Sequence, residues 1–164
     1  MTAARLPNIH ACRRYVRSLK LELYASAYEL CDQMSSLRDR PIRVIEWPLP
    51  IPGPMGVWIA RERDDVIVVQ EAATGSHRDH IVLHELAHIL CEHEGIPLQG
   101  HQSGFLSEFD DQAAGAAPVR FRSVYDSASE REAELLATAL GERLSDDSAA
   151  PRVAWDVHRY FSGE

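Results

Sequence analysis

The chain has 164 residues, of which 45% are hydrophobic and 26% are charged. This length and balance are typical of one globular domain that buries its own core, so we expect residues 1–164 to form a single domain. The formal net charge of −8 argues against a surface that binds the phosphate backbone of nucleic acids. No continuous apolar segment predicts a signal peptide or a membrane span.

Basic residues and cysteines are placed unevenly. Residues 1–20 contain five basic side chains and no acidic one, which indicates a solvated helix face or, alternatively, a docking surface for an acidic partner. The three cysteines, Cys12, Cys31 and Cys91, are widely spaced and form neither a CxxC motif nor a disulfide framework. We therefore expect a cytoplasmic protein.

The first half of the chain predicts a helix followed by three strands. Apolar residues spaced by three and four predict one amphipathic helix over residues 9–37. Runs rich in β-branched residues predict strands at 42–47, 56–60 and 66–70, the last two forming a hairpin. The proline-rich segment 48–54 is expected to be an extended loop.

The second half predicts helices around a long loop. Apolar stripes predict helices over 78–93 and 127–144, and a short last helix is expected at 152–161. Residues 95–122 show no clear period, and loops of this length inside a domain are often functional. The expected fold is α+β: a small, three-stranded, mainly antiparallel sheet packed on the N-terminal helix and the helix over 78–93.

Residues 84–88 have the sequence HELAH and carry the strongest functional signal. On a helix, His84 and His88 lie on one face, one turn apart, and can bind one metal ion together. A catalytic zinc usually takes three protein ligands and a water molecule. Glu85 could take a proton from that water and deliver it to a leaving amine. The motif predicts a zinc hydrolase, and the alternative is a polar helix face with two solvated histidines.

The third ligand is expected on the helix over 127–144. Glu130 lies three and seven residues before Ala133 and Ala137, so it continues a face whose small residues allow a close helix approach. Glu134, one turn further, is the main rival, and it could instead orient a ligand histidine by accepting its free N–H. Glu132 is expected to point nearly opposite. The competing interpretation is a capping box, formed by Ser127 with Glu130 or by Ser129 with Glu132.

Other candidate ligands near the motif are less well placed. The metzincin pattern would need glycine and histidine where the chain has Cys91 and Glu94. A straight helix cannot easily direct three stacked turns at one ion, so we expect His80 beside a ligand or in solvent. His93 and His101 are expected in the wrong place or on an unpatterned loop, and Cys91 is expected to be a buried, inert thiol.

HELAH at 84–88 followed by EREAELLA at 130–137 resembles the ImmA/IrrE family of metallopeptidases. The resemblance covers roughly residues 10–145, including the order of a helix, a three-stranded sheet and the motif helix. The chain departs from the common family pattern at Leu136, where an aromatic residue is usual. It also departs at Glu134, where Asn or Asp is usual.

The resemblance implies a zincin-like, minimal gluzincin fold. It implies that His84, His88 and Glu130 bind zinc and that Glu85 is the general acid/base. It also implies an intracellular peptidase that cleaves a protein partner such as a helix-turn-helix repressor. The biological settings of such enzymes are stress response, mobile-element control and toxin–antitoxin-like pairs.

The main hypothesis is therefore a cytoplasmic zinc endopeptidase whose substrate pairs with an edge strand within 56–70. Tyr125 or His101 could stabilise the oxyanion, and the 95–122 loop could line the cleft. The alternative is a non-catalytic metal-binding module that regulates a partner by contact through the basic face at 13–20. A third hypothesis is a zinc hydrolase that acts on small molecules in a closed pocket.

Overall fold

The computed structural model describes residues 5–95, 120–122 and 125–144. The α+β class is confirmed, and the elements are helices α1 (Ile9–Ser18), α2 (Ala27–Arg38), α3 (Gly75–Leu90) and α5 (Ser127–Gly141), and strands β1 (Ile42–Trp47), β2 (Gly56–Ala60), β3 (Asp65–Gln70) and β4 (Arg120–Arg122). Most of the predicted loop over 95–122, the predicted helix at 152–161 and His101 lie outside the described residues.

The described strands form one mixed sheet in the order β1–β3–β2–β4. β2 pairs antiparallel with β3 and with β4, whereas β1 pairs parallel with β3. The predicted hairpin of β2 and β3 is therefore confirmed. The three-residue β4 extends the three predicted strands, and it is too short to show a hydrophobic period. Because β3 is internal and β4 pairs with Trp58–Ala60 of β2, the expectation of an edge strand within 56–70 is wrong, and the edge strands of the described sheet are β1 and β4.

The prediction of one helix over 9–37 is wrong, because the chain turns between α1 and α2. Lys20 has a φ of 51°, a left-handed conformation that no helix interior allows. Ser26 then caps α2 by accepting a hydrogen bond from the backbone N–H of Glu29, the pattern of an N-terminal cap. Leu23, which the helical period placed on the buried stripe, is 73% exposed.

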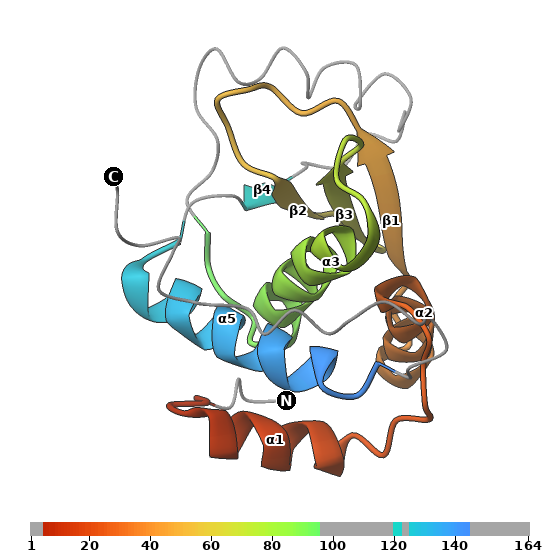
Figure 1. Ribbon diagram of the computed structural model, residues 1–164, viewed down its shortest axis with the longest axis vertical. Coiled ribbons are helices and arrows are strands. Elements are labelled where there is room, and N and C mark those ends of the chain that lie inside the picture. Colours follow the sequence, from red (N-terminus) through yellow and green to blue (C-terminus); the bar gives the residue numbers. More distant parts are fainter. Residues whose placement is uncertain (1–4, 96–119, 123–124, 145–164) are drawn as a thin grey trace.

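Helix α3 occupies the centre of the molecule (Figure 1). It packs on β2 and β3 with one side and on α5 with another, while α1 contacts α5 and α2 contacts both α3 and β1. Ala133 and Ala137 on α5 and Ala87 on α3 are completely buried, and their small side chains let the two helices approach closely. This close α3–α5 contact positions the candidate site.

Among the described helices, none combines the length and apolar character needed to cross a membrane.

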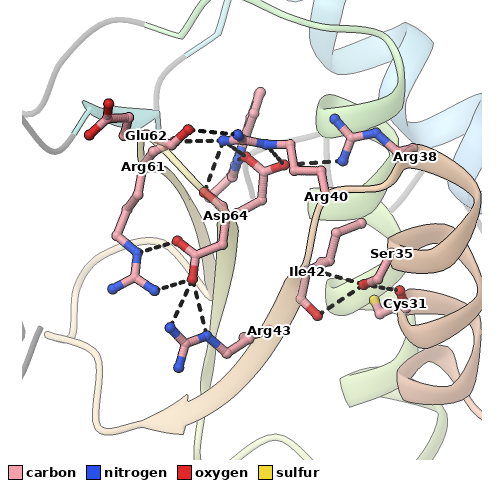
Figure 2. Close-up of polar contacts among 11 residues, drawn as sticks. Cys31, Ser35, Arg38, Arg40, Ile42, Arg43, Arg61, Glu62 and Asp64 are labelled. Carbon is pink, nitrogen blue, oxygen red and sulfur yellow. Dashed lines mark hydrogen bonds and ion pairs between the residues drawn. The ribbon is translucent and has the colours of Figure 1, made fainter. Parts of the chain in front are cut away.

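A charged network fixes the end of the sheet where β2 turns into β3 (Figure 2). Asp65 accepts hydrogen bonds from Arg38, Arg40 and the indole N–H of Trp58. Its side chain is only 2% exposed. We refer to the residues of this network as the arginine cluster: Arg38, Arg40, Arg43, Arg61, Asp64 and Asp65.

Candidate metal centre

The contact between α3 and α5 brings three of the predicted ligands together. The Nε2 atoms of His84 and His88 lie 3.1 Å apart. The Oε2 atom of Glu130 lies 3.2 Å from Nε2 of His84 and 3.8 Å from Nε2 of His88. Two residues one helical turn apart therefore supply two imidazole nitrogens, and a facing helix supplies a carboxylate oxygen.

This spacing fits a metal ion. Ligand atoms about 2.0–2.1 Å from a tetrahedral zinc ion lie roughly 3.3–3.4 Å from one another, close to the three distances between these atoms. The His88 side chain is fully buried, whereas those of His84 and Glu130 are 23% and 35% exposed, so the group is open on one side. His84, His88 and Glu130 are thus positioned to bind a metal ion and to leave a further position accessible.

Glu134 lies on the other side of the His84 ring. Its Oε2 atom is 3.3 Å from Nδ1 of His84 and 3.2 Å from Nε2 of His80. It therefore contacts the nitrogen that faces away from Glu130, as expected of a residue that orients a metal-binding histidine. His80, expected beside a ligand or in solvent, lies next to this carboxylate.

The start of α5 does not use either predicted capping box. Asp126 is the N-cap residue, and its side chain accepts a hydrogen bond from the backbone N–H of Ser129 at 2.7 Å. The competing interpretation of Glu130 as a capping residue is therefore wrong. An aspartate is as good an N-cap as a serine, and Asp126 directly precedes the serines on which that interpretation depended.

Glu85 is buried between α3 and β2, with 6% of its surface exposed. A Cβ atom at Gly56 would lie 2.8 Å from its Oε1 atom and 2.9 Å from its Cγ atom, so only glycine at this position of β2 leaves room for the side chain. Its Oε2 atom is buried and has no hydrogen-bond partner within the described part of the chain. Such an atom is costly unless water or a ligand satisfies it.

Burial and charge divide the protonation states of the centre. Burial raises the pKa of Glu85 to about 7, and the nearby charge of Glu130 also raises it, against the opposing effect of His84. Burial lowers the pKa of His88 to about 4. For His84, burial opposes the proton, but hydrogen bonds to Glu130 and Glu134 raise its pKa to about 10. In the absence of a metal, His84 is therefore protonated and His88 neutral at pH 7, where Glu85 is close to its pKa.

A second group of polar side chains lies behind His88. α3 ends at Leu90 rather than at the predicted His93, and Glu92 has a left-handed φ of 54°. This turn brings the His93 ring back, so that its Nδ1 atom lies 2.9 Å from Nδ1 of His88 and its Nε2 atom lies 3.2 Å from Oε2 of Glu132. As expected, neither His93 nor Glu132 belongs to the group of His84, His88 and Glu130, but both lie behind His88, which the sequence did not predict. Helical spacing could not show the turn that brings His93 back.

Cys91 and Tyr125 also lie beside this group. Ligand atoms of Cys91, His93 and Glu132 lie within 4.8 Å of one another. Burial raises the pKa of the Cys91 thiol to about 12, which agrees with the expected unreactive thiol. The Tyr125 ring stacks on His88 with a centroid distance of 3.6 Å, and its proposed contact with an oxyanion stays a prediction.

Comparison of the chain with models of protein families, with curated proteins and with solved structures gave no match. The functional assignment therefore depends on the geometry of His84, Glu85, His88 and Glu130. This group combines three metal-binding atoms, an accessible side and a buried carboxylate with an unsatisfied oxygen.

Proposed function

We propose that the chain is a zinc-dependent endopeptidase with a zincin-like, gluzincin-type site related to that of the ImmA/IrrE metallopeptidases. The observation that carries the proposal is the triangle of two histidine nitrogens and one glutamate oxygen, with sides of 3.1, 3.2 and 3.8 Å. Two imidazoles and one carboxylate around an open position are a donor set of catalytic zinc sites in peptidases.

The chain's own residues divide the work of hydrolysis. His84, His88 and Glu130 would hold zinc, which acts as a Lewis acid on the scissile carbonyl and makes water more acidic. Glu85 accepts the proton of the attacking water and delivers it to the leaving amine. Its raised pKa of about 7 suits this exchange near neutral pH, because such a carboxylate both accepts and releases a proton readily.

The substrate that we propose is an extended segment of an intracellular protein, in line with the resemblance to enzymes that cleave DNA-binding repressors. The described part of β4 pairs only with Trp58–Ala60, so the Gly56 end of β2, which contacts Glu85, has no strand partner on that side among the described residues. An extended backbone could add there as a strand. Ile51, which is 82% exposed, and Met55, 39% exposed, offer apolar contacts in the preceding loop.

The alternative of regulation by contact has less support. Its docking surface was the basic face at 13–20, and Arg13 forms a bidentate ion pair with Glu142 of the same chain. The three cysteines of the chain are free and buried, which agrees with the reducing compartment that we propose for this protein.

The deciding experiment compares the zinc-loaded wild type with Glu85→Gln on a proteome-derived peptide library, with mass spectrometry of new termini and measurement of bound metal. We expect both proteins to retain zinc and the variant to lose about 10²–10⁴-fold in cleavage rate. Glu71→Gln, at an exposed position, is the matched control and should cleave like the wild type. Equal cleavage by Glu85→Gln would disprove the mechanism.

A further inference from the structure

A chain of hydrogen bonds runs from the N-terminal segment to the candidate metal centre. The backbone N–H of Leu6 donates to Oε1 of Glu132. Oε2 of Glu132 lies 3.2 Å from Nε2 of His93, and Nδ1 of His93 lies 2.9 Å from Nδ1 of His88. His88 in turn directs its Nε2 atom at His84 and Glu130. These contacts join three segments that are distant in the sequence.

The carboxylate of Glu132 determines which atom donates in each hydrogen bond between Glu132 and His88. An ionised carboxylate only accepts hydrogen bonds, so Nε2 of His93 must carry the hydrogen that lies between them. A neutral His93 then has a lone pair at Nδ1 and accepts from Nδ1–H of His88. His88 is left with a lone pair at Nε2, the atom that faces the metal-binding group. The reverse arrangement would direct an N–H at that group and prevent His88 from binding metal.

We propose that His93 and Glu132 are positioning residues that hold His88 in the orientation and tautomer required to bind the metal ion. The inference rests on the metal site of the proposed function but not on the peptidase reaction. It gives each metal-binding histidine its own carboxylate. Glu134 contacts His84 directly, whereas Glu132 acts on His88 through the intervening ring of His93.

The same hydrogen pattern decides against a second metal ion at Cys91, His93 and Glu132, although their ligand atoms lie within 4.8 Å of one another. Nε2 of His93 carries a hydrogen toward Glu132, and Nδ1 of His93 is occupied by Nδ1–H of His88. Neither nitrogen has a lone pair to offer while His88 binds metal through Nε2. The group is therefore part of the support of one site.

Two substitutions of His93 separate positioning from packing. His93→Phe keeps a ring of similar shape but removes the acceptor at Nδ1. His93→Asn loses the ring but places a carboxamide oxygen near the position of Nδ1, where it can accept from His88. A role in packing alone predicts that Phe is tolerated better than Asn, and the proposed role predicts the opposite order.

The experiment titrates Co²⁺ into the metal-free full chain and follows the visible absorption of the bound ion, with Zn²⁺ competition to obtain zinc affinity. We expect His93→Phe to weaken binding of both ions by about 10–100-fold, the usual effect of removing such a support. His93→Asn should recover most of that loss. Glu132→Gln, a smaller change, should weaken binding in the same direction, because Leu6 and His93 contact different oxygens of Glu132 and the carboxamide of Gln has an NH₂ group, which cannot accept, in place of one of them.

Glu142→Gln is the matched control, because Glu142 follows α5 and pairs with Arg13, remote from His88. It should bind Co²⁺ like the wild type. Wild-type affinity in both His93→Phe and Glu132→Gln, or weaker binding by His93→Asn than by His93→Phe, would overturn the inference while leaving the metal site intact. A wild-type chain that binds neither ion would overturn the proposed function and this inference together.

Discussion

Two buried carboxylates that both interact with Trp58 have different surroundings. Asp65 accepts hydrogen bonds from Arg38, Arg40 and the indole of Trp58. Glu85, which the backbone N–H of Trp58 also approaches, keeps a buried oxygen without a partner in the described part of the chain. Burial of charge alone therefore does not mark a functional site. A buried carboxylate whose oxygens all accept hydrogen bonds stabilises the fold, whereas one with an unpaired oxygen can still accept a further partner.

A surface cavity borders the arginine cluster. A cavity of about 350 Å³ is bordered by Arg38, Arg40, Trp58 and Asp65. The guanidinium of Arg40 is already committed to Asp65 and to backbone carbonyls of the β2–β3 turn. A ligand that took its hydrogen bonds from Arg40 in this cavity would have to break those bonds.

The largest expected effect comes from substituting Asp65, whose oxygens all accept hydrogen bonds. Asp65→Asn should lower the free energy of unfolding by about 3–5 kcal/mol, because it removes the buried charge that accepts from Arg38 and Arg40, whose side chains are 26% and 29% exposed. Urea unfolding of the metal-free protein measures this change. Asp64→Asn should cost less, because one partner of Asp64, Arg43, has a side chain that is 62% exposed. If Asp65→Asn is no more destabilising than Asp64→Asn, the proposed difference between buried and exposed pairs is wrong.

Substitution of Glu85, which has an unpaired oxygen, should have the opposite effect on stability. The pKa of Glu85 is raised from 4.5 to about 7 in the folded protein, so between these values the folded state holds a proton that the unfolded state has lost. The free energy of unfolding therefore falls as the pH rises through this window. Glu85→Gln cannot ionise, and at pH 8 it should stabilise the metal-free protein by up to about 3 kcal/mol.

This second effect should nearly vanish at pH 4, where Glu85 is protonated in both states. Urea unfolding with a chelator present, at pH 4 and pH 8, tests the pH dependence. Glu71→Gln, at an exposed position, should change stability little at either pH. A Glu85→Gln variant that is less stable than the wild type at pH 8 would show that the surroundings of Glu85 stabilise its ionised form, contrary to this prediction.

The parts of the fold predicted correctly are those in which one segment determines its own structure. The strands at 42–47 and 56–60 have their predicted bounds, and the helix that carries HELAH is present. Its two histidines and Glu130 lie together, as predicted. This contact could be predicted because the helical spacing and the small residues Ala133 and Ala137 can be read directly from the amino-acid sequence.

The parts that were missed depend on turns and on contacts between distant segments. A left-handed Lys20 divides the predicted helix over 9–37, and apolar spacing continues across that break by coincidence. A left-handed Glu92 returns His93 to His88, whereas helical spacing directs it elsewhere. The contact of Glu132 with Leu6 joins residues 126 positions apart, and no local pattern predicts it.

The smallest expected effect is the dependence of metal affinity on pH. In the metal-free protein at pH 7, His84 is protonated, with a pKa of about 10, whereas His88 is neutral, with a pKa of about 4. Glu130 is already ionised, because its hydrogen bonds to both histidines outweigh burial and lower its pKa to about 2. At pH 8 and above, where Glu85 with its pKa of about 7 is mostly ionised, a metal ion therefore has to displace one proton, from His84, and its affinity should rise about tenfold per pH unit between pH 8 and 9.

Calorimetric titration with Zn²⁺ at pH 8, in buffers of different ionisation enthalpy, counts the released proton directly. Release of no proton, or of two, would contradict these protonation states. Glu134→Gln removes one of the contacts that raise the pKa of His84, so the variant should release less than one proton near pH 8 and show a shallower pH dependence.

The arginine cluster allows no such exchange, because arginine stays protonated throughout this range and hydrogen bonds from Arg61 and Arg43, outweighing burial, lower the pKa of Asp64. Proton exchange thus separates the charged groups that can bind a metal ion from those that only hold the sheet together.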